Sequence, residues 1–254
     1  ENDVVTVVIT SNYSCLTASQ ATSNAIVMDL IYPFDTSVIP TQCGATLLTI
    51  NQYIYANFIA VAQGYRFKVT DLVTNQVQIV DRLLRVFQLT QLGNYAFDRT
   101  YKIEVAAKVN GVWQPYGNPC NVTTPVGITS LVNCGATLSL MNDNIYATNV
   151  PYSIGYRFKI TNTVTSSVDI IDRPIRDFQM AQIASPQYNT LYNVEVAVRN
   201  TDGNYMPYGS LCTVMTPPVP TSKLIAAQCG VTIPANTTVF ADNFVGATTY
   251  RFKF

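Results

Sequence analysis

The sequence predicts an all-β protein built from tandem β-sandwiches in an extended rod. The composition favours strands, because 48% of the residues are hydrophobic, only 12% are charged, and sixteen are Tyr. A long block of sequence recurs, and each copy consists of short segments separated by turn residues. No segment gathers helix-forming residues at a 3.6-residue period. These three observations together predict a chain of small all-β units.

The repeat is carried by motifs that return in the same order. CGATL begins at Cys43 and again, 91 residues later, at Cys134, and the variant CGVTI begins at Cys229. The intervening motifs also recur: GYRFKVT as GYRFKIT, VDR as IDR, YKIEVAAK as YNVEVAVR, and PYGNPCNVTTP as PYGSLCTVMTP. We therefore expect two complete units, over residues 41–126 and 127–218.

Two flanking segments are expected to belong to neighbouring units. Residues 1–40 read as the C-terminal strands of an upstream repeat followed by a linker. Residues 219–254 read as the N-terminal strands of a third unit whose remainder follows this segment. The Pro-rich joins at 124–125 and 217–220 favour an extended arrangement of the units.

The elements of the first unit follow from runs of strand-forming residues between turn signals. We expect strands near 45–50, 52–58, 64–70, 76–81, 85–90, 100–109 and 119–125. Residues 101–108 alternate apolar and polar side chains and then enter the turn Asn110-Gly111. The second unit has Asp202-Gly203 at the same place. Both dipeptides supply positive φ, so each predicts a hairpin between the last two strands.

Composition excludes several classes of function. The 15 basic and 15 acidic residues balance and do not cluster, so there is no basic stripe for nucleic acid. No apolar run is long enough to span a membrane. The chain contains no His, which removes catalytic triads and dyads that need an imidazole base. We expect no enzyme activity and no cofactor.

Two sequence features could suggest catalysis or metal binding, but we favour a structural role for both. The carboxylate pair Asp81 and Glu104 recurs as Asp172 and Glu195, but ion pairing of Asp81 with Arg82 or Arg85 explains it more simply. The oxygen-rich run 142–144 would suit calcium, yet the first unit does not repeat it. We expect no catalytic residue and no metal site.

Exposed aromatics are the remaining candidates for binding. Trp113 and Tyr116 lie on or beside the predicted hairpin tip of the first unit, and Tyr205 and Tyr208 do so in the second. Two interpretations stay open. The rings pack against a neighbouring strand or unit, or they contact a ligand such as a sugar.

The order of these motifs resembles a family. The path from YRFKV through YKIEVAAK to PYG and VTTP is similar to a fibronectin type III domain, in which Tyr101 and Tyr192 would open the sixth strand. The core Trp of that family is replaced here by Tyr and Ile in YIYANFI and NIYATNV. A closer resemblance is to the Cys-containing fibronectin-like repeats of large Bacteroidetes surface proteins, such as the flavobacterial mobile gliding adhesin exported by the type IX secretion system. In those proteins the segment 1–32 is similar to the last strands of a different immunoglobulin-like repeat.

The six cysteines are expected to form disulfides, because zinc-type CxxC pairs and His are both absent. Two pairings compete, one across the linkers and one within each unit. In a sandwich of this kind the first strand and the last strand share the end where the chain enters, which favours Cys43–Cys120 and Cys134–Cys212. Cys15 and Cys229 are then expected to pair outside residues 1–254.

The function expected from this resemblance is structural. It implies a non-catalytic repeat segment of a giant extracellular adhesin, displayed at the outer membrane for surface attachment and gliding motility. Neighbouring repeats would be its partners, with surface polysaccharide or outer-membrane secretion and motility proteins as further candidates. Accessory modules of a large secreted enzyme and a structural surface filament are the alternatives.

Overall fold

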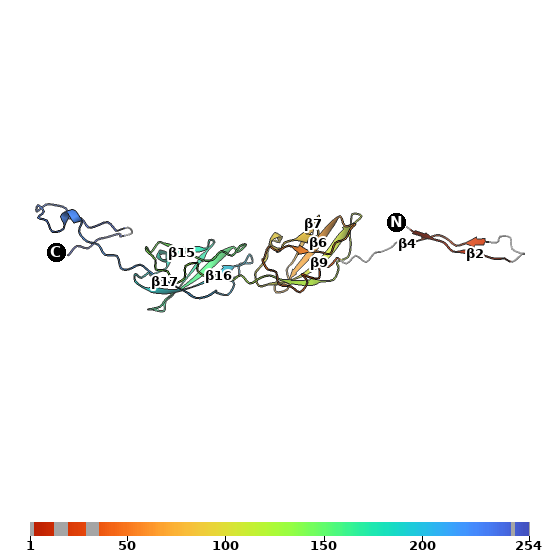
Figure 1. Ribbon diagram of the computed structural model, residues 1–254, viewed down its shortest axis with the longest axis horizontal. Helices are drawn as coiled ribbons and strands as arrows, with labels where there is room; N and C mark the ends of the chain where they lie inside the picture. The colour runs from red at the N-terminus through yellow and green to blue at the C-terminus, as the bar shows by residue number, and fades with distance from the viewer. Residues whose placement is uncertain (1–2, 13–19, 29–35, 245–246, 254) are drawn as a thin grey trace.

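The computed structural model describes residues 3–12, 20–28, 36–244 and 247–253. Two sandwich modules lie end to end in it, with their long axes in one line (Figure 1). Ahead of them, β1 (Asp3–Val5) pairs with β4 (Ile26–Met28), and β2 (Val8–Thr10) pairs with β3 (Gln20–Thr22), to form an antiparallel ribbon. The expectation of tandem all-β sandwiches in a rod is confirmed.

The first module packs a five-stranded sheet against a smaller one. In the larger sheet β7 (Val77–Arg82), β6 (Gly64–Asp71), β9 (Thr100–Val109) and β11 (Cys120–Thr123) lie in that order, and β10 (Val112–Trp113) extends the β9 edge. In the smaller sheet β5 (Ile54–Tyr55) pairs with β8 (Val86–Phe87). A bridge between Val38 and Ala56 adds a third segment to it. This strand order is that of a fibronectin type III-like sandwich.

The second module repeats this arrangement. Its larger sheet has the order β14 (Val168–Arg173), β13 (Gly155–Asn162), β16 (Leu191–Arg199), β17 (Cys212–Met215). Its smaller sheet pairs β12 (Asn144–Tyr146) with β15 (Asp177–Gln179), and Leu131 bridges to Ala147. Short 3₁₀ turns follow β8 and β15, as η1 (Leu89–Gln91) and η2 (Met180–Gln182).

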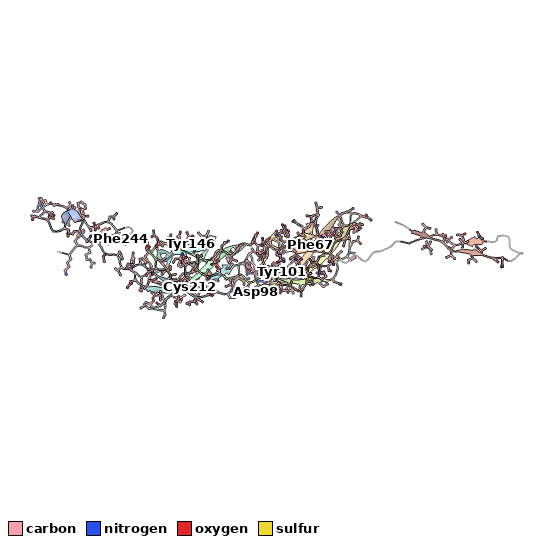
Figure 2. All side chains as sticks on the ribbon, viewed as in Figure 1. Phe67, Asp98, Tyr101, Tyr146, Cys212 and Phe244 are labelled. Carbon is pink, nitrogen blue, oxygen red and sulfur yellow. A yellow bond between two sulfur atoms is a disulfide. The ribbon has the colours of Figure 1, made fainter. Side chains whose placement is uncertain are left out.

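Alternating side chains build each core. Along β6 the inward residues Tyr65, Phe67 and Val69 are at most 4% exposed. Phe67 meets Phe87 of the opposite sheet with 4.5 Å between ring centroids, a normal distance for a tilted aromatic pair. Phe158 and Phe178 repeat this contact in the second module at 4.7 Å. Figure 2 shows Phe67 inside the first sandwich.

A buried tyrosine fixes the start of β9. Tyr101 is 1% exposed, and its hydroxyl accepts a hydrogen bond from the backbone N–H of Ala96 at 2.9 Å. The Tyr192 hydroxyl accepts the equivalent bond from Gln187 at 3.0 Å. This arrangement is the tyrosine corner typical of such sandwiches. Burial raises the pKa of Tyr101 to about 12.

The first strand lies earlier than the sequence suggests. The segment that pairs with β5 is residues 36–39, where Ile39 N–H donates to Tyr55 C=O and Val38 is 2% exposed. From the sequence, these residues are expected to belong to the upstream segment, residues 1–40. The expected first strand, 45–50, instead contributes a short parallel contact with β11, through Thr46 and Thr123. The repeat motif CGATL marks this second contact and gave no signal for the first.

The C-terminal segment repeats one contact of the two modules. Leu224 bridges to Ala241 as Leu131 does to Ala147, and η3 (Ala226–Gln228) follows. Residues 247–253, which contain the repeated YRFK motif, form no strand in the part of the chain that the structure describes. Tyr250 there is 38% exposed, whereas its counterpart Tyr156 in the second module is 4% exposed.

Candidate interaction sites on the sheet face and at the module joint

The predicted contact aromatics all lie over cations of the larger sheet. In the first module Trp113 covers Arg66, with 4.4 Å from the guanidinium carbon to the ring centroid, and Tyr116 faces the Lys68 ammonium at 5.4 Å. The second module repeats both pairs, Tyr205 with Arg157 at 3.8 Å and Tyr208 with Lys159 at 5.5 Å. Such cation–π contacts stabilise exposed sites by about 0.5–1 kcal/mol. All four rings are therefore engaged by side chains of their own module.

Carboxylates complete this outer face. Arg66 Nε lies 2.7 Å from Asp81 Oδ1 and Arg66 Nη2 2.7 Å from Oδ2, and Lys68 Nζ lies 2.9 Å from Glu104 Oε2. Hydrogen bonds from Arg66 hold the pKa of Asp81 below its usual range, and hydrogen bonds from Lys68 do the same for the pKa of Glu104. Each carboxylate that suited glycoside hydrolysis is thus held by a cation of the neighbouring strand, β6 in the first module and β13 in the second.

The partner of Asp81 differs from the sequence expectation. The expected partners were Arg82 and Arg85, but successive side chains of β7 point to opposite faces of the sheet. The register sets Arg66 directly opposite Asp81, and that cross-strand neighbour forms the ion pair. Arg157 and Asp172 are opposed in the same way in the second module.

The oxygen-rich run at 142–144 serves its own loop. The Asp143 carboxylate accepts the backbone N–H groups of Ser139 and Leu140, both at 2.8 Å. No group of three or more His, Cys, Asp or Glu side chains suited to a metal ion occurs among the described residues.

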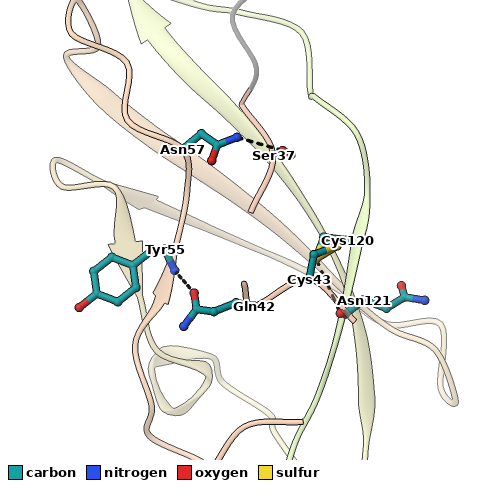
Figure 3. The surroundings of a disulfide bond; sticks show 7 residues. All are labelled: Ser37, Gln42, Cys43, Tyr55, Asn57, Cys120 and Asn121. Carbon is teal, nitrogen blue, oxygen red and sulfur yellow. Dashed lines mark hydrogen bonds between the residues drawn. A yellow bond between two sulfur atoms is a disulfide. The ribbon is translucent and has the colours of Figure 1, made fainter. Parts of the chain in front are cut away.

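The disulfides join the two segments that run in parallel through each module. Cys43 is bonded to Cys120 with Cα atoms 5.3 Å apart, and Cys134 to Cys212 with Cα atoms 5.2 Å apart. This is the pairing within each unit. Beside the first bond Gly44 N–H donates to Asn121 C=O at 2.8 Å, and the neighbouring Gln42 side chain accepts from Tyr55 N–H (Figure 3). Gly44 has a φ of +77°, a value that favours glycine after the cysteine.

The disulfides lie at a different place in the module from the one that the sequence predicts. They do not lie at the end where the chain enters. Cys120 pairs with Ile103, within β9, and residues 44–47 after Cys43 run parallel to residues 121–123 of β11. Cys229 is exposed and free, and Cys15 lies outside the described residues.

The two modules contact each other directly at a site that we call the joint. On the first module it is formed by residues 50–51 and 95–99, and on the second by residues 152 and 200–202. Asp98, in the first of these loops, lies at the end of its module that faces the second one (Figure 2). Ile50 and Phe97, 3% and 5% exposed, belong to the hydrophobic core of the second module. The core of the second module therefore extends onto residues of the first, whose own core is a separate cluster.

Backbone hydrogen bonds fix the two loops against each other. The N–H of Tyr95 donates to Thr201 Oγ1 at 2.8 Å, and that hydroxyl donates in turn to the Tyr95 carbonyl. The N–H of Phe97 donates to Asn200 Oδ1 at 3.0 Å. Each of these bonds depends on a backbone group, so together they set the position of the second module's hairpin.

A charged group closes the joint at its edge. Arg99 Nη1 lies 2.8 Å from Asp71 of its own module, and Arg99 Nη2 lies 3.0 Å from Asp202 of the next. The Arg99 side chain is 11% exposed, so this network is shielded from solvent. Burial alone would raise the pKa of Asp202, but hydrogen bonds from Asn204 and the nearby Arg99 charge lower that pKa overall.

The linker glycine is required by close packing. A Cβ atom on Gly127 would lie 2.6 Å from the Phe97 ring. Real Cβ atoms do not approach carbon so closely, so any larger residue would push the ring out of the joint.

Sequence reasoning missed the joint residues because they do not repeat. Tyr95, Phe97 and Arg99 have Pro186, Tyr188 and Thr190 at the equivalent places. The signal that was present is a difference in length. The hairpin of the second unit is one residue longer than that of the first, AVRNTDGNYMPYG against AAKVNGVWQPYG. That longer hairpin is the one that reaches into the joint.

No protein-family model matches this chain, and no curated protein matches it. Among solved structures it is similar to the FN1–FN3 domains of chicken CNTN1, with 12% identity and a TM-score of 0.30 over 79% of this chain and 74% of that one. It is also similar to a two-domain fibronectin type III segment of chicken tenascin, with 12% identity and a TM-score of 0.33 over 65% of this chain and 91% of that one. At these scores the assignment of fibronectin type III-like sandwiches rests on the strand order and register of the chain itself.

Proposed function

We propose that this chain is a rigid, non-catalytic spacer within an extracellular cell-surface adhesin, of the kind that serves attachment and gliding. The observation that carries the proposal is the joint, in which Ile50 and Phe97 of one module complete the core of the next. A spacer must hold its length and direction, and a shared core supplies both.

The joint is unlike the usual contact between domains of one chain. Domains in series move relative to each other unless their interface is large and hydrophobic. Here a buried phenylalanine, three hydrogen bonds to backbone groups and a shielded ion-pair network act on the same two loops. Rotation of the second module would expose the ring and break the hydrogen bonds together, so bending is opposed at several points.

The cysteines support a place outside the cell. Two disulfides, each closing most of a module, form and persist in oxidising compartments. Among the described residues no helix is long and apolar enough to cross a membrane. The resemblance of the repeat motifs to Bacteroidetes surface repeats supports surface display and the adhesin role.

The ion-paired sheet face supports the absence of catalysis. The carboxylates and aromatic rings that would supply chemistry are bound to cations of their own sheet in both modules. A face of this kind stabilises the module and leaves no free acid and base pair at Asp81 and Glu104.

Residual dipolar couplings of the full chain test the rigid spacer directly. If the joint is fixed, residues 36–126 and 127–218 align with one common tensor, and the scattering profile in solution fits a single elongated shape. Two independent tensors would refute it. Antibodies raised against residues 36–218 should label intact, unpermeabilised cells of the source, and labelling only after permeabilisation would overturn the surface location.

A further inference from the structure

We propose that the disulfide of each module carries mechanical load, so that tension along the rod passes through the sulfur atoms and leaves most of the module unloaded. The purpose of this device rests on the proposed function as an extended surface rod. The load path itself follows from geometry alone.

The first step is where force enters and leaves a module. The modules lie end to end, so the first one is pulled at residues 36–39 and at residues 124–126 (Figure 1). Cys43 lies shortly after the entering segment, and Cys120 shortly before the leaving one. The covalent path between the two ends therefore runs from Thr36 to Cys43, across the disulfide, and from Cys120 to Val126.

The second step is which residues the disulfide removes from the load path. Cys43 and Cys120 are 77 positions apart, so the 76 residues between them lie in a closed loop outside the load path. That loop contains every strand of the larger sheet except β11. In the second module Cys134 and Cys212 are 78 positions apart and enclose the equivalent strands.

The third step is what would resist the force without the bond. The segment after Cys43 runs parallel to β11, and force would act on the opposite ends of these two segments, which shears them. Three hydrogen bonds oppose this shear: Gly44 N–H to Asn121 C=O at 2.8 Å, Leu47 N–H to Thr123 C=O at 2.8 Å, and Thr123 N–H to Ala45 C=O at 3.0 Å. The second module has the same three bonds at 2.8–3.0 Å. The disulfide lies at the first residue of this parallel pair, where it takes the load before the hydrogen bonds do.

The extended length of a module differs widely between the module with its disulfide intact and the module without it. With the bond intact, seven steps from Thr36 to Cys43 and six from Cys120 to Val126 extend to at most roughly 50 Å, at about 3.6 Å per residue. The folded module is already about 33 Å long if judged by the ten residues of β9. Without the bond, the 77 steps of the loop add about 280 Å of chain.

Force spectroscopy on single full-length chains, tethered by tags at both ends, tests the proposal. A Cys15→Ser/Cys229→Ser background removes the other two thiols. Under oxidising conditions we expect no unfolding step from either module longer than about 20 Å. After a phosphine reductant is added to the same tether, we expect two long steps of roughly 290 Å each, the extended length of the whole module less its folded length.

A matched variant keeps one module as an internal control. Cys43→Ser/Cys120→Ser should give one long step without reductant, and Cys134→Ser/Cys212→Ser should give the other. Circular dichroism and thermal unfolding establish first that each variant is folded. Long steps in the oxidised chain would overturn the proposal, and so would their absence in a folded, reduced chain. Either result leaves the zero-force alignment test of the rigid spacer unaffected.

Discussion

Replacing Phe97 by alanine should separate the two modules while leaving each one folded. The ring belongs to the core of the second module although its backbone belongs to the first, and it is 5% exposed. A buried aromatic side chain removes about 150–250 Å² from water, which at about 25 cal/mol per Å² is worth roughly 4–6 kcal/mol. Measured Phe→Ala losses in cores are about 3–5 kcal/mol. We therefore expect the variant to lose about 4 kcal/mol of coupling between the modules.

Equilibrium unfolding in urea, followed separately for each module by NMR, measures that loss. The wild-type modules should unfold in one shared transition, and Phe97→Ala should split it into two, with the second module unfolding first. Phe58→Ala is the matched control, because Phe58 is 72% exposed and lies outside the joint. A Phe97→Ala chain that still unfolds in one transition at the wild-type midpoint would show that the shared core does not couple the modules.

Three further substitutions test other parts of the structure. The folded-state pKa of Asp202 is lowered, so its contribution to the joint is present above its unfolded pKa near 4 and is lost as pH falls through the folded value. The alignment tensors of the two modules, which agree at pH 7, should therefore begin to diverge as pH falls below about 4, and Asp202→Asn should remove this pH dependence. Tyr101→Phe leaves the buried N–H of Ala96 without its acceptor, and denaturant unfolding should show a loss of about 1–3 kcal/mol. Trp113→Ala removes the ring over Arg66, and calorimetry should show a loss of no more than about 1 kcal/mol, whereas a loss of several would mean that the ring is part of the core.

The repeat made most of the fold predictable. Strands of the larger sheet follow motifs that recur at a fixed spacing, and Tyr101 and Tyr192 lie where the resemblance puts the tyrosine of the sixth strand. Alternation within 101–108 predicted the buried face of β9. These features are local or periodic, so a single sequence contains enough information to show them.

The first strand and the ion pairs could not be predicted from local or periodic sequence features. The segment at 36–39 is held by one bridge and a few hydrogen bonds, and no periodic pattern marks so short a contact. Asp81 pairs with Arg66 because of the register between β6 and β7, and register is set by the whole sheet. Sequence neighbours such as Arg82 were the nearest candidates along the chain but point to the other face.

The joint shows why the least repetitive residues of a repeat protein can matter most for its shape. Asp71 and Asn162 are equivalent, and each caps its own turn through the backbone N–H groups two and three residues later. The second carboxylate oxygen of Asp71 binds Arg99, which continues to Asp202 of the next module. The amide nitrogen of Asn162 instead donates to Gln187 of its own module.

The change from a carboxylate oxygen at Asp71 to an amide nitrogen at Asn162 thus decides whether this end of a module joins an ion-pair network that reaches the next module or forms a hydrogen bond within its own module. The fold of the sandwich does not depend on this difference, because the turn cap is the same in both modules. The direction of the next module does depend on it, because that module contacts the loop that contains Arg99. Repeats that conserve the core and vary this end can therefore keep a common fold while each joint is set separately.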